Sequence, residues 1–263
     1  MVTSPRKRAQ RARLVQYAVL TAIVVLAVLS ADWQNIGEKL FDPEVLKQLW
    51  PEVFTVGMRN TLIYTAGSFA FGLVVGLLLA LMRLSPVTAY RWIATGVIEF
   101  FRGVPALVVF IGFGYGLPIA FKLEIPGGVV GTVIVALGLV GGAYMAETIR
   151  AGIQAVPKGQ LEAARSLGMS PGQGMRKVVI PQAFRIVLPP LTNELILLTK
   201  DSSLVYVLGL TAADYELTKF GREKLNELVS LAPLIGVAFC YLLITIPLSI
   251  VVRRMEARAG KAR

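Results

Sequence analysis

The chain contains long apolar stretches that carry few or no charged residues. Residues 61–82, for example, include no Asp, Glu, Lys or Arg and lie between Arg59 and Arg83. About 20 such residues let an α-helix cross the hydrocarbon core of a bilayer, where the backbone must satisfy its own hydrogen bonds. Comparable stretches cover residues 14–30, 92–120, 129–146, 229–252 and, with interruptions, residues from 182 onward. The sequence therefore predicts an all-α integral membrane protein with about six transmembrane helices.

The residue types present exclude several kinds of chemistry. Histidine is absent, which removes the commonest metal ligand and the usual general base near neutral pH. The single cysteine, Cys240, lies in an apolar stretch, so no disulfide can form within the chain. No lysine is followed by Ser or Thr, so the chain lacks the phosphate-binding loop of ATPases. We expect no catalytic residue, no metal and no cofactor in this chain.

The lysines and arginines are distributed unevenly between the two predicted sides of the membrane. Six spans place both termini and the loop at 157–181 on one side. The other side receives eight of the 27 basic residues, namely Lys39, Lys47, Arg59, Lys122, Lys200, Lys219, Arg222 and Lys224. The positive-inside rule then predicts that the termini and the 157–181 loop are cytoplasmic in the plasma (inner) membrane. This distribution explains the net charge of +11 by topology and anionic lipid, without nucleic acid.

The N-terminal region precedes a predicted core. Basic residues before the apolar stretch 14–30 resemble a signal peptide, but this stretch is long enough to span and we expect a retained helix. Residues 31–58 mix acids, prolines and aromatics, which is typical of an external amphipathic segment at the interface. We therefore divide the chain into 1–58, a transmembrane core at 59–253, and a basic cytoplasmic tail at 254–263.

Three short sequence patterns within the predicted spans indicate how helices and charged side chains pack there. Gly72-x-x-x-Gly76 allows a second helix to approach closely in lipid. Glu147 and Arg150 are three residues apart and share a helix face, as do Glu99 and Arg102. For both charged pairs we favour a structural ion pair, or side chains that extend to the interface, over a gate.

The loop at 157–181 reads as two short helices joined by a turn. Residues 160–167 are good helix formers, and Gly168 suits the left-handed position that follows a helix end. Ser170, Pro171 and Gln173 have the spacing of a capping box with proline at the first helical position. We expect the second helix to stop at Pro181, because the residue before a proline favours extended geometry.

This loop also resembles a known family motif. Glu162-Ala163-Ala164, three residues, Gly168, nine residues and then Val178-Val179-Ile180-Pro181 resemble the "EAA" loop of binding-protein-dependent ABC importer permeases. The usual motif ends in Ile-x-Leu-Pro, so Val178 and Ile180 are conservative departures. Residues 99–108 and 181–204 resemble the polar amino-acid branch of that family, and the likeness covers residues 60–252.

The resemblance implies a fold, a set of partners and a role for the loop. The fold is the transmembrane domain of a type I ABC importer with a cytoplasmic helix–turn–helix coupling loop. The partners are a cytoplasmic ABC ATPase dimer that binds ATP and Mg²⁺, a second permease subunit (identical or paralogous) and an extracytoplasmic amino-acid-binding protein. Glu162, Ala163, Ala164 and Gly168 would contact the ATPase. From the residues alone, the loop could instead lie on the membrane surface, although an acid beside small residues is a poor anchor there.

The stretch from 182 onward is apolar but interrupted by prolines and polar residues. A broken helix that lines a cavity tolerates such residues, and intramembrane charges usually face a pathway or one another. The alternative is a helix that ends near Lys200 at the outer interface. The candidate substrate-pathway residues are Asn193, Glu194, Lys200, Asp201, Ser202 and Ser203, and the family has a similar lysine–acid–hydroxyl stretch.

Two other classes of function are compatible with the spans. An ion-gradient-driven secondary carrier would use Glu194 and Asp201 as coupling sites. A membrane anchor that only scaffolds a partner would have no reason to keep polar residues within its spans. We therefore interpret the chain as the permease subunit of an ATP-driven importer of polar amino acids, with the secondary carrier as the alternative.

Overall fold

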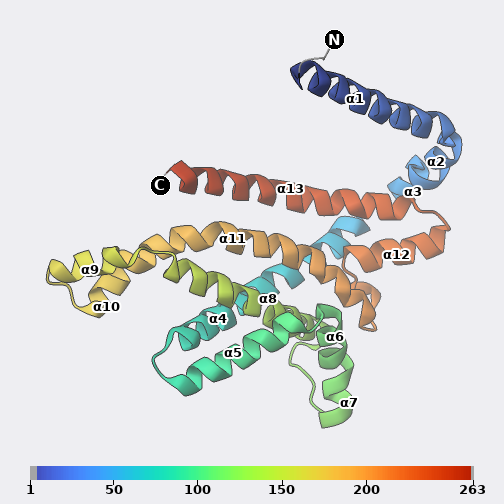
Figure 1. The fold of residues 1–263 in the computed structure, drawn as a ribbon. Helices are drawn as coiled ribbons and strands as arrows, with labels where there is room; N and C mark the ends of the chain where they lie inside the picture. The colour runs from blue at the N-terminus through green and yellow to red at the C-terminus, as the bar shows by residue number, and fades with distance from the viewer. Residues whose placement is uncertain (1–4, 262–263) are drawn as a thin grey trace.

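A computed structural model describes residues 5–261, and all regular structure in that range is helical. The helices are α1 (Pro5–Ser30), α2 (Trp33–Leu40), α3 (Pro43–Gln48), α4 (Arg59–Leu84), α5 (Thr88–Gly103), α6 (Ala106–Ile111), α7 (Leu117–Phe121), α8 (Gly128–Gln154), α9 (Lys158–Ser166), α10 (Pro171–Gly174), α11 (Ile180–Asp201), α12 (Leu217–Leu228) and α13 (Ala232–Lys261). Figure 1 shows α9 and α10 at one end of the bundle, and α3 and α12 at the opposite end.

Within this range, four helical segments are long and apolar enough to cross a membrane. They are Ala12–Ser30, Val53–Leu84, Gly128–Gln154 and Ala232–Ala257. A bent pair, Thr88–Gly103 with Ala106–Phe121, is also long and apolar enough when taken together, and forms either a broken fifth span or a re-entrant loop. The remaining long helix, α11, has 22 residues and carries the polar residues that interrupt its apolar stretch. The prediction of an all-helical, multi-span protein is confirmed.

The third predicted span is not the single helix expected at 92–120. Its two halves meet at an angle of 104°, and Val104 between them is extended. Pro105 follows directly, and a proline disfavours helical geometry in the residue before it. The stretch predicted as a third span at 92–120 is therefore bent before Pro105, which its apolar composition alone does not reveal.

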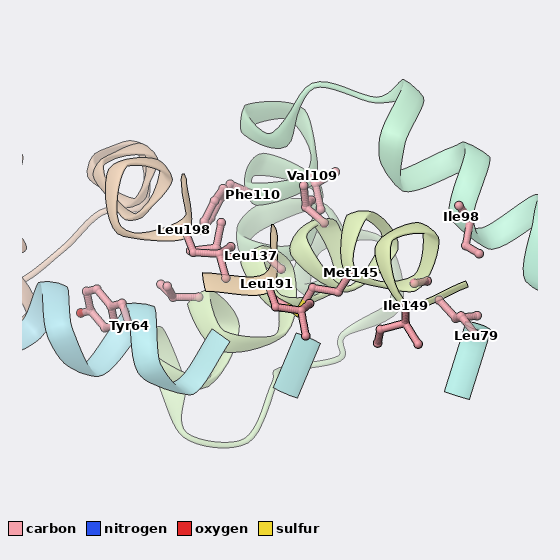
Figure 2. Close-up of a cluster of buried hydrophobic side chains, with 14 of the residues drawn as sticks. Tyr64, Leu79, Ile98, Val109, Phe110, Leu137, Met145, Ile149, Leu191 and Leu198 are labelled. Atoms are coloured by element: carbon pink, nitrogen blue, oxygen red, sulfur yellow. The ribbon is translucent and has the colours of Figure 1, made fainter. Parts of the chain in front are cut away.

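The core forms where α4 crosses α8 at glycine-lined surfaces. A Cβ atom added to Gly72 would lie 2.7 Å from the carbonyl oxygen of Gly138, and one added to Gly76 would lie 2.8 Å from that of Gly142. The close approach predicted from the glycine pair is therefore confirmed. Around this crossing lies a buried apolar cluster with contributions from α4, α5, α6, α8 and α11 (Figure 2).

The polar composition of residues 211–228 is typical of a loop, but most of these residues form helix α12. The buried carboxylate of Glu216 caps this helix and accepts hydrogen bonds from the backbone N–H groups of Thr218 and Lys219. Tyr241 on α13 also donates to it, at 3.2 Å. Burial raises the pKa of Glu216 to about 7, although these hydrogen bonds oppose the shift. Sequence analysis did not identify helix α12, because polar and charged residues make up most of this segment.

Helix α1 lies apart from the core, whereas the segment after it packs on α12 and α13 through the buried Leu49 and Val53. The apolar span in α1 has none of its residues buried, and α1 extends away from the other helices (Figure 1). Short helices α2 and α3 follow, each capped by an aspartate, in the segment predicted to be interfacial. A π-helical turn at Val53–Met58 leads into α4, so the second span begins eight residues before the expected position 61. The division at residue 58 and the retention of α1 stay predictions.

Candidate functional site

The 157–181 loop folds through two hydrogen-bonded caps. At the end of α9, the N–H of Gly168 donates to Arg165 O (2.9 Å) and that of Met169 to Ala164 O (3.1 Å), which is the Schellman pattern. Gly168 has φ +85°, the left-handed conformation that glycine adopts without strain. Ser170 and Gln173 then form the reciprocal capping box at the start of α10. The predicted helix–turn–helix is confirmed.

The second helix of the loop does not stop at Pro181. Ile180 has φ −60° and ψ −44°, and α10 continues through a π-helical turn at Met175–Val179 directly into α11. A proline within a regular α-helix removes one hydrogen bond and clashes with the carbonyl four residues earlier. The wider π turn gives Pro181 room at the start of α11. The predicted stop was therefore wrong, and the helical rod is unbroken.

Apolar contacts fix the loop to the bundle. Val156, Val179 and Ala183 are buried together where α8 ends and α11 begins. Between α9 and α10, a Cβ atom on Gly174 would lie 2.8 Å from Leu161 and 3.5 Å from Ala164. The absence of a side chain at Gly174 thus brings α10 close against α9. The two short helices are therefore packed against each other and against the ends of α8 and α11.

The four predicted ATPase-contact residues differ in exposure. Glu162, Ala163 and Gly168 are exposed, whereas Ala164 is only 4% exposed because it packs inside the loop. Leu167, which the sequence interpretation did not single out, is 82% exposed at the tip of the loop. An apolar residue directly before the C-terminal glycine of a surface helix was the available signal.

Helix α11 carries the predicted substrate-pathway residues and runs unbroken to Asp201. Pro189 and Pro190 lie inside it without a break, so of the two alternatives that the sequence left open, the helix that ends near Lys200 is the one observed. The chain continues beyond Asp201 as a 3₁₀ turn, Ser202–Val207. Neighbouring helices α4, α8 and α13 pack along α11 and hold its course despite the missing hydrogen bonds.

The structure separates the pathway candidates into two groups. Glu194 and Asp201 are partly buried and lie seven residues apart, so they share one face of α11, about two turns from each other. Asn193 and Lys200 repeat this spacing on the adjacent, exposed face. Ser203 is partly buried, but the buried hydroxyl of Ser202 donates to Thr199 O at 2.8 Å within its own helix. Among the described residues, no salt bridge joins Lys200 to either acid.

The predicted ion pair on α8 is confirmed and larger than expected. Glu147 contacts Arg150 at 2.8 Å and also contacts Arg83 from the end of α4. The second predicted pair does not form in the described part of the chain, since Arg102 lies instead over the ring of Tyr144, 5.5 Å from its centre.

The fold and the loop define a class of protein. Several spanning helices, a polar face within the bundle, and a rigid helix–turn–helix loop at one end are the architecture of a transport permease of the ABC importer type. The model of the family described as "Binding-protein-dependent transport system inner membrane component" matches residues 72–261. The chain belongs to this family.

Known relatives resemble the chain over most of their length. It is 40% identical over 206 residues to the probable glutamine ABC transporter permease protein GlnM of Bacillus subtilis, covering 78% of this chain and 93% of GlnM. It is 35% identical over 217 residues to the L-cystine transport system permease protein TcyB of the same organism, covering 82% and 90%. A solved "amino acid ABC transporter with histidines" superposes with a TM-score of 0.74 at 35% identity, covering 82% of this chain and 98% of that chain.

Proposed function

We propose that this chain is the membrane-spanning subunit of an ATP-driven importer of polar amino acids. The observation that carries the proposal is the capped, rigidly anchored loop of α9 and α10 in a chain that belongs to the permease family. The names of its relatives, which include glutamine and L-cystine, favour a polar amino acid without selecting one. The chain has no phosphate loop, so ATP and Mg²⁺ bind a partner ATPase.

The loop docks on this ATPase from the cytoplasmic side. Glu162, Ala163 and Gly168 are free to contact it, and Leu167 supplies an apolar side chain for a groove. Ala164 acts indirectly, because it holds α9 against α10. When ATP closes the two ATPase subunits, the paired loops move together and carry the ends of α8 and α11 with them.

The pathway for substrate lies along the polar face of α11, between this chain and a second permease subunit. Glu194 and Asp201 offer carboxylates to an α-amino group, while Asn193, Lys200 and Ser203 offer donors to a carboxylate. Ser202 contributes to the position of the helix end. An extracytoplasmic binding protein delivers the amino acid. Nucleotide shifts the transporter between its inward-facing and outward-facing states only because these two states bind ligands with different affinity.

Reconstitution tests the energy source. The chain, co-purified with its ATPase and any second permease, is placed in proteoliposomes with the binding protein outside and radiolabelled amino acids as substrate. We expect uptake only with ATP inside. Uptake by the chain alone under an ion gradient would instead establish a secondary carrier.

Chemical labelling tests the proposed topology, in which both termini and the loop face the cytoplasm. Cys240 is buried, so a Ser166→Cys variant provides one accessible thiol on the loop. We expect a membrane-impermeant maleimide to modify it in inside-out vesicles but not in intact cells. Labelling of intact cells would overturn the orientation.

A further inference from the structure

An arginine-lined cavity that is open to the surface lies between the end of α4, the start of α5 and the end of α8. Its volume is about 440 Å³, within the usual range for sites that hold small ligands. The lining residues are Arg83, Arg91, Trp92, Thr95, Arg150 and Gln154. The α4–α5 connection is at the same end of the bundle as α9 and α10 (Figure 1), far along α11 from Asp201. The cavity is therefore separate from the proposed substrate pathway.

The arginines that line the cavity outnumber the carboxylates that contact them. Glu147 is the carboxylate in contact with Arg83 and Arg150, and it balances one of these two charges. The guanidinium of Arg91 donates to Ser85 O (3.2 Å), Pro86 O (3.1 Å) and Thr88 Oγ1 (3.1 Å), which are all uncharged. Three arginines thus face one carboxylate among the described residues.

The three arginines are held in place before any ligand binds. Arg83 and Arg150 are about three-quarters buried, with exposed side-chain fractions of 24% and 26%. The backbone carbonyls of the α4–α5 turn fix one edge of the Arg91 guanidinium. Ligand binding would therefore cost little further side-chain entropy at Arg91. Guanidinium groups bind phosphate oxygens through paired, charge-assisted hydrogen bonds.

The position at the membrane surface indicates the source of such an anion. Trp92, 74% exposed beside the cavity, is the residue type enriched at the interface between hydrocarbon and headgroups. The cytoplasmic leaflet contains anionic lipids that attract basic residues near its surface. The leaflet assignment depends on the proposed topology, whereas the binding of phosphate does not.

We propose that the cavity at Arg83, Arg91 and Arg150 binds a phosphate group, the chemistry that an anionic phospholipid headgroup and a soluble phosphate ester share. A bound lipid would secure the α4–α5 turn to the end of α8. This site is distinct from the transport function, because the binding of phosphate there requires neither the transported substrate nor the ATPase.

Fluorescence of Trp92 reports on this cavity directly. In a full-length Trp33→Phe/Trp50→Phe chain, Trp92 is the only tryptophan left of three. This chain is reconstituted into phosphatidylcholine vesicles with brominated phosphatidylglycerol or, at the same mole fraction, brominated phosphatidylcholine as quencher. We expect stronger quenching by the anionic lipid, and a preference that falls about five-fold in Arg91→Gln, as expected for one basic residue at an anionic surface.

Two matched variants distinguish lipid binding at this site from a general attraction of anionic lipid by surface charge. Arg91→Lys should keep most of the preference, and Arg254→Gln, an exposed arginine at the end of α13, should keep all of it. Equal quenching by the two lipids, or an Arg91→Gln variant that matches Arg254→Gln, overturns the proposal. In a second arm, glycerol 1-phosphate is added to vesicles that contain the anionic lipid. Relief of quenching would identify a soluble ester as a ligand of the same site, and unchanged quenching would identify the lipid.

Discussion

Substitution of Gly72 by alanine should loosen the crossing of α4 and α8. The added Cβ would lie 2.7 Å from Gly138 O and 3.2 Å from Gly142 N, and both contacts are to backbone. A contact below 3.0 Å with backbone cannot be relieved by a rotamer change, so the two helices must separate by several tenths of an ångström. Overpacking of this kind costs roughly 1–3 kcal/mol. In lipid, close packing is a main source of helix association, so the whole core is affected.

The buried Cys240 provides the assay. It is the only cysteine and is 5% exposed, so a thiol-reactive fluorogenic maleimide reports its exposure as the protein unfolds in detergent. For a chain of this size, roughly 1–3 kcal/mol corresponds to a decrease in Tm of about 2–12 °C. A Cys240→Ser variant, which should give no signal, establishes that the dye reads this residue.

Gly96→Ala is the matched control. Gly96 lies within α5, and its added Cβ would meet nothing within 4 Å. Alanine there should raise Tm slightly, since it restricts the unfolded chain without a new contact. If Gly72→Ala and Gly96→Ala unfold at the same temperature, the glycine crossing does not limit stability and the reasoning fails.

Three further predictions concern the 157–181 loop, the proposed substrate pathway and the buried carboxylate of Glu216. Glu162→Lys should abolish coupled uptake while membrane insertion is unchanged; wild-type uptake with normal ATPase co-purification would contradict the docking role. Asp201→Ala should change substrate affinity without release of the ATPase, and loss of the ATPase would make Asp201 structural. Because burial raises the pKa of Glu216 from its ordinary value of 4.5 to about 7, the folded state binds a proton more tightly than the unfolded state. Its contribution to stability is therefore present below about pH 4.5 and decreases as the pH rises to about 7. Glu216→Gln should flatten this decrease in Tm, and an unchanged pH profile would exclude Glu216 as its source.

The sequence predicted those features of the fold that depend only on residues close together in the chain. The Schellman end at Gly168 and the capping box at Ser170 are set by conformational preference within a few residues, so their sequence signals were sufficient. The close helix approach at Gly72 and Gly76 could also be anticipated, because the missing side chains leave room for a second helix, and α8 occupies it.

The features that sequence reasoning missed depend on tertiary context. Pro181 stops an isolated helix, but the π turn before it allows α10 to continue into α11. Helix α12 depends on Glu216, whose carboxylate is buried only because α4 and α13 enclose it. Hydrogen bonds from Asn60 to Ala213 O (2.7 Å) and from Tyr64 to Asp214 O (2.9 Å) fix the chain on the α4 side. Such contacts join residues about 150 positions apart and leave no local pattern.

The uninterrupted rod from Pro171 to Asp201 has a mechanical consequence. At about 1.5 Å per residue, it runs for about 45 Å from the α9–α10 end of the bundle toward the end that holds α12, without an intervening loop (Figure 1). If the proposed ATPase tilts this rod at its Pro171 end, the Asp201 end is displaced as well, by an amount that depends on where α4, α8 and α13 hold α11. The π turn at Met175–Val179 and the pair Pro189–Pro190 interrupt the regular α-helical hydrogen bonding, so we expect any bending of this rod to occur there.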